Sequence, residues 1–324
     1  MQTRTLAGYE HVYELECAGS RAFIAIHAAL RGRAFGGVRI RAYASDEHAL
    51  TDALALAEAM TRKVVLAGID GGGAKSVLRL PPPHRRAAAI HQLGRFIDSL
   101  GGRYQCGGDY GFTAADEAVL RAATRHVACG DLAEATARSV ELAIFAAADP
   151  RVVALQGLGA VGRPLARRLL ARGVRVIAAD PTWPEDLVPG DTLQRVDPAA
   201  IYGVDCDVFA PCAHGGVLDA STIPRLRAAL VCGAANNPFA AADDVDRLNA
   251  RGVAYIPDVI ANAGATIVGA SNALDEEAHI DRRFAAIPAL IHDLLDRSRS
   301  ERRSTHWIAH ELADQRIAAL RRPA

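Results

Sequence analysis

A glycine-rich turn between two apolar runs constrains the fold of this chain more than any other feature. Residues 152–156 form a short apolar run, and Gly157-Leu158-Gly159-Ala160-Val161-Gly162 follows at once. An amphipathic stretch comes next, and a second apolar run, residues 174–179, ends at Asp180, 18 residues beyond the last glycine. Strand, glycine turn, helix, strand and acid in this order are typical of the first βαβ unit of a Rossmann-type sheet.

The same turn predicts a dinucleotide site. Residues without a Cβ allow a tight turn and close approach of a pyrophosphate to the helix N-terminus. Asp180 is placed to bind the adenosine ribose hydroxyls, and its charge would repel a 2′-phosphate, which favours NAD over NADP as the cofactor. Glycine-rich turns are common by themselves, so the prediction rests on the whole pattern. The predicted cofactor-binding residues of this turn are Gly157, Gly159, Ala160, Val161, Gly162 and Asp180.

Three further apolar runs, residues 208–210, 230–232 and 253–256, indicate that the sheet continues. Each run ends near small or polar residues, as expected for a parallel sheet whose carboxyl edge faces a ligand. Asn236 and Asn262 fall at these edges. An asparagine by itself more often forms a turn than binds a ligand. Both a turn-forming role and a cofactor-binding role therefore stay open for these two residues.

Lysine is rare in this chain. Lys63 and Lys75 are the two lysines among 37 Lys and Arg residues, and the segment around them is mostly apolar residues and glycine. Arginine stays protonated, whereas burial or a nearby cation can lower the pKa of a lysine by units, so lysine suits proton transfer. We interpret the pair as a candidate active site. The alternative is a compositional accident, with two surface amines in an arginine-biased sequence.

The region around the lysines predicts an α/β unit. Ser45 can cap a helix on which Lys63 shares a face with core residues such as Leu56. We expect residues 64–69 to form a strand that leads into a turn at Gly71-Gly72-Gly73, with Lys75 just beyond the turn. A hairpin is predicted over residues 9–29, a helix after the three prolines to about residue 100, and Asp109 follows in a second glycine cluster.

Composition excludes several classes of protein. The 324 residues carry no formal net charge and half are apolar, which argues against a nucleic-acid partner and suggests about two domains. No apolar run reaches the roughly 20 residues of a membrane span, and no signal peptide is evident, so we expect a cytoplasmic protein without membrane partners. Six scattered cysteines without a C-x-x-C pair predict buried thiols and no metal site.

Several motifs together resemble the leucine, phenylalanine and valine dehydrogenases of the Glu/Leu/Phe/Val dehydrogenase superfamily. The similarity runs in order from about residue 20 to 270. The motifs that carry it are Gly36-Gly37-Val38-Arg39, residues 43–63, the glycine run before Lys75, Gly102-Arg103-Tyr104 with Asp109, residues 201–213, and Pro257-Asp258 through Asn262-Ala263-Gly264.

The resemblance implies a two-domain α/β fold and an activity. Residues 1–135 would form an N-terminal substrate domain, residues 136–303 a Rossmann-type NAD-binding domain, and helix 304–324 would return to the first domain, with a cleft between the two. The implied reaction is reversible, NAD-dependent oxidative deamination of an L-amino acid to the 2-oxo acid and ammonia. Ammonia, amino acid and oxo acid would be its small-molecule partners.

The resemblance also implies roles for individual residues. Lys75 would be the general base, with Asp109 beside it. Lys63 would hold the substrate carboxylate, helped by the backbone of Gly37, and Asn262 would face the nicotinamide side of the cofactor. The remaining implied contacts are Met60 and Gly107 for the substrate and Ala210, Pro211 and Asn236 for the cofactor.

Substrate size is predicted from two positions that line the side-chain pocket in the resembling family. Here they are Gly107 and Gly269, and two glycines leave room for a bulky apolar or aromatic substrate, with Phe35 as an aromatic wall. The alternative is that both glycines only serve backbone turns.

The sequence departs from the family pattern in three places. Ala74 separates the glycine run from Lys75, and residues 129–139 lack the usual glycine- and proline-rich loop that supplies a hydroxyl near the nicotinamide, so Thr136 or Ser139 would have to replace it. The chain is also short at its ends, which favours a homodimer over an octamer. Two alternatives remain open: an enzyme of a specialised biosynthetic route acting on an unusual amino or imino acid, and a catalytically silent NAD-binding subunit.

Overall fold

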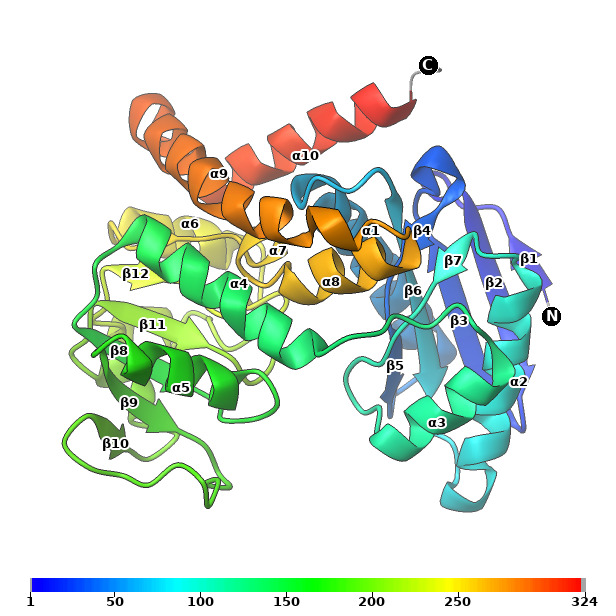
Figure 1. Cartoon of the computed structure of the whole chain (residues 1–324), viewed down its shortest axis with the longest axis horizontal. Coiled ribbons are helices and arrows are strands. Elements are labelled where there is room, and N and C mark those ends of the chain that lie inside the picture. Colours follow the sequence, from blue (N-terminus) through cyan, green and yellow to red (C-terminus); the bar gives the residue numbers. More distant parts are fainter. Residues whose placement is uncertain (1, 322–324) are drawn as a thin grey trace. The chain divides into compact units, whose positions relative to one another are not determined.

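A computed structural model of the protein describes residues 2–321 and divides the chain into two compact units (Figure 1). The first unit comprises Met1–Gly130, Val268–Ala278 and Ala313–Ala324, and the second comprises Asp131–Ile267 and His279–Leu312. We expected the first boundary after residue 135 and the return to the first unit at residue 304. The boundary falls at 130 because Asp131 caps a helix that belongs wholly to the second unit.

The first unit is built on a mixed sheet in the order β1-β2-β3-β6-β4-β7, with β5 also paired to β6. The β2–β3 hairpin confirms the prediction over residues 9–29, and its turn uses Ala18 and Gly19 with positive φ. Its strands are β1 (Gln2–Arg4), β2 (His11–Cys17), β3 (Ser20–Ile26), β4 (Ala34–Phe35), β5 (Val38–Arg41), β6 (Gly72–Arg79) and β7 (Tyr104–Gln105).

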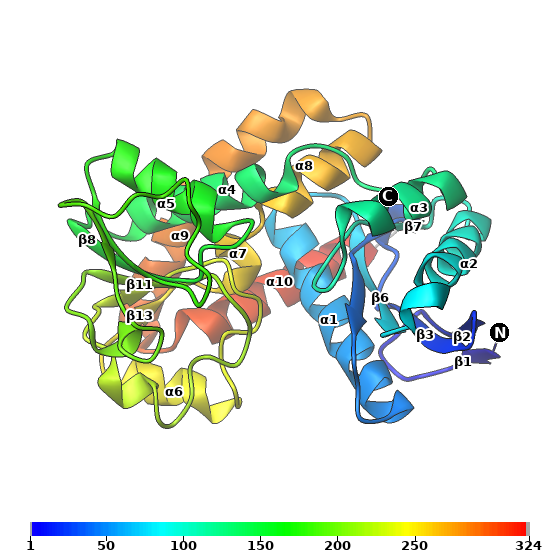
Figure 2. The same cartoon turned by 90° about the horizontal axis from the view of Figure 1, so that it is seen from below.

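Helices cover both faces of this sheet (Figure 2). Successive side chains of a strand point to opposite faces, so the burial partners of each strand residue show which helices cover which face. Phe23 and Val77 pack on alanines of α1 (Asp46–Leu66). Ile24 and Leu78 point the other way, toward α2 (Arg86–Ser99) and α3 (Ala114–Ala123). Ser45 caps α1 as predicted, because its side chain accepts a hydrogen bond from the His48 N–H.

The expected strand over residues 64–69 is wrong, because α1 continues to Leu66. The expected turn before Lys75 is wrong as well: Gly72 and Gly73 already belong to β6. A Cβ on Gly73 would lie 2.1 Å from the Thr61 backbone nitrogen of α1. These glycines therefore let a strand and a helix pack backbone to backbone, and Lys75 sits in the interior of the strand.

The second unit contains a six-stranded sheet in the order β10-β9-β8-β11-β12-β13, and all of its pairings are parallel. The strand order reverses between β8 and β11, where such sheets bind ligands. Strand β8 has the predicted bounds, the other four predicted strands differ from prediction by one residue at one or both ends, and β10 was not predicted. The strands are β8 (Val152–Gln156), β9 (Arg175–Ala179), β10 (Leu193–Arg195), β11 (Val208–Pro211), β12 (Leu230–Val231) and β13 (Ala254–Tyr255).

Helices α4 and α9 pack side by side in the second unit, with α5 next to α4 (Figure 1). The remaining α-helices and the short 3₁₀ helices complete the chain, and within residues 2–321 no helix has the length and apolar character needed to cross a membrane. The bounds are α4 (Leu132–Ala147), α5 (Gly162–Ala171), α6 (Asp243–Ala250), α7 (Asp258–Ala261), α8 (Gly264–Ala273), α9 (Ile280–Glu301), α10 (Thr305–Arg321), η1 (Leu30–Gly32), η2 (Pro83–Arg85), η3 (Ile201–Gly203), η4 (Ile223–Arg225) and η5 (Glu277–His279).

Candidate active site

A buried lysine and an aspartate meet in the first unit. Lys75 lies within β6, and its Nζ is 2.7 Å from Oδ2 of Asp109, which follows β7. The Lys75 residue is only 5% exposed. The Asp109 N–H donates to the carbonyl of Val38 at 3.1 Å, which fixes the loop that carries the carboxylate. The structure thus brings together the two residues that we predicted to be the base and its neighbour.

Arg39 of β5 binds the same carboxylate oxygen. Its Nε lies 3.0 Å from Asp109 Oδ2, and its Nη1 lies 3.1 Å from Oδ2 of Asp52 on α1. The Tyr43 hydroxyl donates to that Asp52 oxygen at 2.5 Å. The sequence motifs included Arg39, Tyr43 and Asp52, but none of the three was assigned a role. The available signal was that Arg39 alternates with the core residues Val38 and Ile40, which directs it toward the opposite face.

The surroundings shift the pKa of both members of the pair. Burial lowers the pKa of Lys75, and the Arg39 cation lowers it further, while Asp109 opposes both effects. Burial would raise the pKa of Asp109, but Lys75 and Arg39 hold it well below its usual range. The carboxylate therefore stays ionised, and the lysine is poised to lose its proton more easily than an exposed lysine.

Gly37 brings the backbone close to this pair. A Cβ on Gly37 would lie 3.0 Å from Asp109 Cβ and 3.2 Å from Lys75 Nζ. The Gly37 carbonyl accepts hydrogen bonds from the Tyr104 hydroxyl at 3.2 Å and the Ser76 N–H at 3.0 Å. A side chain at position 37 would thus fill the space directly beside the amine.

Lys63 and Met60, which we predicted to contact the substrate, lie in the last turns of α1, the helix that packs on β6. Lys63 is 7% exposed, although a lysine near a helix end usually reaches solvent. Met60 is half-buried against a cluster that includes Phe35 and Ala270. Phe35, expected as an aromatic wall, is thus part of this core and is 5% exposed.

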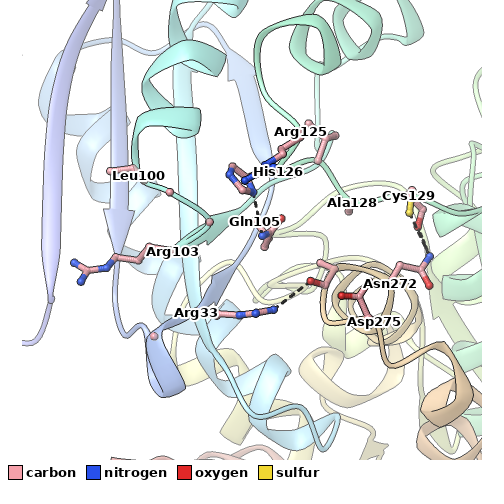
Figure 3. Close-up of a pocket in the computed structure, with 15 residues that line it drawn as sticks. Arg33, Leu100, Arg103, Gln105, Arg125, His126, Ala128, Cys129, Asn272 and Asp275 are labelled. Atoms are coloured by element: carbon pink, nitrogen blue, oxygen red, sulfur yellow. Dashed lines mark hydrogen bonds between the residues drawn. The ribbon is translucent and has the colours of Figure 1, made fainter.

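Gly107, predicted to line the substrate pocket, is buried but leaves room for a Cβ. A Cβ there would meet only Ala128 Cβ, at 3.5 Å, among the described atoms within 4 Å. Gly269 lies in α8 of the first unit. Ala128 also borders a cavity of about 860 Å³ in this unit (Figure 3).

The cavity in Figure 3 has a basic lining and does not contain the lysine pair. Arg33 donates to the Ala273 carbonyl at 3.2 Å, and the Gln105 amide lies 3.3 Å from Nδ1 of His126. Neither Lys75 nor Asp109 is among the described residues that line it. Its remaining lining residues are Gly32, Leu100, Gly101, Gly102, Arg103, Arg125, Val127, Cys129, Asn272 and Asp275.

The glycine turn lies at the carboxyl edge of the second unit's sheet. Gly157 has a φ of 97°, and a Cβ on Gly162 would lie 1.9 Å from the Gly157 carbonyl oxygen, so both glycines are required by the turn itself. A Cβ on Gly159 would meet no described atom within 4 Å. The turn therefore leaves open space at Gly159, beside the N-terminus of α5, where a pyrophosphate could approach.

Asp180 follows β9 and is held by the turn. Its Oδ2 accepts a hydrogen bond from the Leu158 N–H at 2.7 Å, and its Oδ1 accepts one from the Thr182 N–H at 2.8 Å. The carboxylate thus lies next to the glycines, as the sequence pattern predicted.

Two predicted asparagines meet at the same edge. Asn262 is 4% exposed, and its Nδ2 donates to the Ala234 carbonyl and to Oδ1 of Asn236, each at 2.9 Å. Its own Oδ1 is buried without a hydrogen-bond partner among the described residues. A buried acceptor without a protein donor leaves a position at which an N–H group of a ligand can bind. Ala210 and Pro211 end β11, the neighbouring strand.

Known proteins identify the family to which these two sites belong. Residues 13–126 match the Glu/Leu/Phe/Val dehydrogenase dimerisation domain, and residues 186–308 match the Glutamate/Leucine/Phenylalanine/Valine dehydrogenase domain. The chain belongs to the Glu/Leu/Phe/Val dehydrogenase family. It is therefore an amino-acid dehydrogenase, of a family that uses a nicotinamide cofactor, and the predicted resemblance and two-domain α/β fold are confirmed.

Relatives in this family carry different substrate names. The leucine dehydrogenase of Bacillus cereus is 34% identical, with 94% of this chain and 89% of that protein covered. The L-tryptophan dehydrogenase of Nostoc punctiforme is also 34% identical, with 97% and 95% covered. Its crystal structure matches with a TM-score of 0.82 over 97% of both chains, at 33% identity. A hetero-hexameric glutamate dehydrogenase from Thermus thermophilus shares the fold, with a TM-score of 0.78 at 20% identity over 95% of this chain and 88% of that one.

Thr136 and Ser139, the two residues considered as replacements for the hydroxyl of the loop that this chain lacks, both make hydrogen bonds within the second unit. Thr136 donates to the Leu132 carbonyl at 2.8 Å within α4. Ser139 is fully buried, donates to the Thr136 carbonyl and accepts from the Gly264 N–H at 3.0 Å. Ser139 thus ties α4 to the start of α8.

The sequence analysis predicted that the six cysteines are buried thiols, and the structure agrees for some of them. Cys17, Cys106 and Cys232 are buried, but Cys206 and Cys212 are intermediate and Cys129 is exposed, so the prediction of buried thiols is wrong for Cys129. The backbone carbonyl of Cys129 accepts a hydrogen bond from the side-chain amide of Asn272 in the same unit. Over residues 2–321, no group of three or more His, Cys, Asp or Glu side chains is arranged to hold a metal ion.

Proposed function

We propose that the protein catalyses reversible, NAD-dependent oxidative deamination of a bulky hydrophobic L-amino acid to the 2-oxo acid and ammonia. The observation that carries the proposal is the buried contact of 2.7 Å between Lys75 and Asp109 in a chain with two lysines. A lysine that is buried beside a carboxylate and a second cation suits acid–base chemistry near neutral pH. Family membership supplies the reaction class.

In the proposed reaction Lys75 is the general base. NAD, when bound, would supply the acceptor for the hydride of the substrate α-carbon, and the iminium forms from the substrate with a neutral amino group. Lys75 in its neutral form removes a proton from water as the water oxygen adds to the iminium carbon, and it then gives that proton to the nitrogen. Neutral again, Lys75 takes the proton of the new hydroxyl group as the carbonyl forms and ammonia leaves. Asp109 stays ionised throughout and accepts a hydrogen bond from the protonated amine.

Lys63 and Gly37 are proposed to hold the substrate. The Lys63 ammonium offers a charge for the α-carboxylate, and the space beside Gly37 places that carboxylate against the backbone near Lys75. Met60, next to Lys63 on α1, adds an apolar contact. These contacts would increase the rate because they fix the position of the substrate α-carbon relative to the base.

NAD is proposed as the cofactor because the residues at the edge of the second sheet suit it. Gly159 leaves room for the pyrophosphate, and Asp180 suits the two ribose hydroxyls of NAD better than the phosphate of NADP. The unpartnered Oδ1 of Asn262 suits the nicotinamide carboxamide, whose N–H groups would complete it. The other proposed cofactor contacts are Gly157, Ala160, Val161, Gly162, Ala210, Pro211 and Asn236.

Substrate size is proposed from the open surroundings of Gly107. The related enzymes are named for leucine, valine and tryptophan, so the family relationship alone leaves the size open. Glycine at position 107, where an added Cβ would meet only Ala128 among the described atoms within 4 Å, favours the larger side chains. We also propose a homodimer formed through the first unit, because its matched domain is described as a dimerisation domain.

A scan of NAD reduction over the twenty proteinogenic L-amino acids tests this function, with the pure protein and with NADP in parallel. We expect NADH formation with hydrophobic amino acids and release of ammonia equal to NADH. Binding of NADH without turnover of any amino acid would instead favour the silent subunit. Turnover confined to an unusual amino or imino acid would favour the specialised enzyme.

A further inference from the structure

A chain of four charged side chains, ended by a tyrosine, leads away from the lysine amine. It runs from Lys75 to Asp109, Arg39, Asp52 and Tyr43, and each link is a hydrogen bond or ion pair of 2.5 to 3.1 Å. The members come from β6, the loop after β7, β5, α1 and the segment between β5 and α1. Convergence of charged groups from separate elements is unusual unless they constrain one another.

Arg39 occupies the centre of this chain. The Arg39 side chain is 15% exposed, compared with 25% for Asp52 and 20% for Asp109. Its Nε faces Asp109 and its Nη1 faces both oxygens of Asp52, at 3.3 and 3.1 Å. A guanidinium offers donors in a fixed plane, so one rigid group sets the distance between the two carboxylates.

Asp109 Oδ2 accepts from two cations at once. Lys75 Nζ and Arg39 Nε both bind this oxygen, at 2.7 and 3.0 Å. If Arg39 were absent, the carboxylate would lose one of the groups that fix its orientation, and Lys75 would be the remaining cation at this oxygen among the described residues. With Arg39 in place, the carboxylate is already paired when Lys75 loses its proton, because the guanidinium keeps its charge at any pH of interest.

We propose that Arg39 is a positioning residue for the deamination: it holds the Asp109 carboxylate against the Lys75 amine and compensates that carboxylate when the amine becomes neutral, while Asp52 and Tyr43 hold Arg39. The inference rests on the proposed function of Lys75 as the base. Arg39, Asp52 and Tyr43 thus act through Asp109 and Lys75 and do not contact the reacting atoms themselves.

The proposal predicts the sign of each electrostatic effect on Lys75. Arg39 lowers the pKa of Lys75, whereas Asp109 and Asp52 raise it. Loss of the Arg39 charge should therefore raise this pKa, and loss of the Asp52 charge should lower it. The elements that pack against β6 carry other titratable groups, and none of these changes in Arg39→Met or Asp52→Asn. They are Asp46, Glu47, His48, Glu58, Arg62 and Lys63 on α1, Arg21 on β3 and Arg41 on β5, and the Tyr104 hydroxyl also bonds Ser76 of β6.

The two lysines allow a direct measurement that does not depend on turnover. Protein labelled with [ε-¹³C]lysine gives two lysine signals, which Lys63→Arg assigns. Titration of the Lys75 signal in Arg39→Met should show a midpoint raised by about one pH unit, and Asp52→Asn should show a lowered midpoint. Arg41→Met removes an exposed arginine two residues along β5 and should leave the midpoint unchanged.

Kinetics supply the second readout. The acid limb of kcat/KM against pH should move to higher pH in Arg39→Met, kcat/KM should fall about tenfold or more, and Arg39→Lys should recover part of the loss. A Lys75 midpoint in Arg39→Met equal to that of the wild type would overturn the proposal, whatever the activity. If Arg39→Met does not fold, Asp52→Asn decides the question, because a midpoint that does not fall would overturn it equally. Absence of any wild-type turnover would defeat the proposed function, and the NMR titration would still test Arg39.

Discussion

Lys75 and Asp109 are 34 positions apart in the sequence, and their side chains meet at 2.7 Å within one unit of the protein. The strand β6 carries the lysine between β3 and β5, and the loop after β7 returns the aspartate to it through the backbone of Val38. Burial of the amine penalises its charge, and the carboxylate offsets part of that penalty. Burial lowers the pKa of Lys75 and Asp109 raises it, so the amine can both gain and lose a proton during the reaction.

Replacement of Lys75 by alanine should reduce kcat for deamination by about 10²- to 10⁴-fold, because general acid–base help is of that size. Affinity for NADH, measured by fluorescence titration, should stay within a factor of about three, since the proposed cofactor residues lie in the other unit. Arg41→Ala, an exposed change on β5, serves as the control. A Lys75→Ala enzyme with more than half of the wild-type turnover would remove Lys75 from the mechanism.

Wild-type deamination should also depend on pH in a defined direction. The pKa of Lys75 is lowered, chiefly by burial, and the base must be neutral to act. The value of kcat/KM should therefore rise with pH along a limb whose midpoint lies below the free-lysine pKa of about 10.4. A limb centred at or above the free-lysine value would contradict the proposed environment of Lys75.

Lys63 should act on substrate binding more than on the chemical step. Lys63→Ala is expected to raise KM for the amino acid by about tenfold or more, with a smaller change in kcat, because an anchor for the carboxylate contributes to ground-state binding. Steady-state kinetics with the best substrate measure both constants. An unchanged KM would rule out this role, and a melting temperature close to that of the wild type must accompany the result, because Lys63 is buried.

The sequence predicted the second unit better than the first. Strands such as β8 and β9 are short, largely buried apolar runs, one leading into Gly157 and the other following Gly173, and few other structures can accommodate that pattern. The end of α1 was misassigned because Val64 and Val65 favour a strand locally, while packing on β6 through Gly73 extends the helix. Local preference carries no information about that contact, since the two elements meet only in the folded chain.

Tertiary contacts also limited what the sequence could predict about the candidate active site. Lys75, Asp109 and Asp180 could be identified because rare residue types or glycine motifs mark them in the sequence. The alternation of Arg39 with the core residues Val38 and Ile40 indicated its face but not its partners, and Asp52 is an ordinary charged residue on an amphipathic helix. Their importance arises from a tertiary arrangement in which one guanidinium bridges two carboxylates.

The contact of Gly73 with α1 makes a prediction about stability. Gly73→Ala should lower the free energy of unfolding by more than about 3 kcal/mol, because a Cβ at 2.1 Å from the Thr61 nitrogen forces the strand off the helix. The control is Gly190→Ala, an exposed position where a Cβ would meet no described atom within 4 Å, which should change it by less than about 0.5 kcal/mol. Chemical denaturation measures both, and equal stabilities would show that the strand can shift freely.

Cofactor choice should depend on the charge of Asp180. The wild type is expected to prefer NAD, and Asp180→Asn, which keeps the shape of the side chain, should raise the ratio of kcat/KM for NADP to that for NAD by about tenfold, because a like charge no longer faces the 2′-phosphate. Asp186→Asn, on the surface of the same unit, is the control. Equal use of both cofactors by the wild type would contradict the role of Asp180.

Substrate size provides the last prediction, and Gly107 is the position that tests it. We expect kcat/KM for phenylalanine or tryptophan to exceed that for valine or leucine, since glycine at this position leaves the space in front of Ala128 open. Gly107→Ala should fold, because its Cβ would meet Ala128 at an ordinary 3.5 Å. The added methyl group should reduce kcat/KM for the aromatic substrates by about 10- to 200-fold relative to valine, the range that one methylene is worth in an apolar pocket. Gly190→Ala should leave the ratio unchanged. A wild type that prefers valine tenfold over both aromatic amino acids would show that other residues close the pocket.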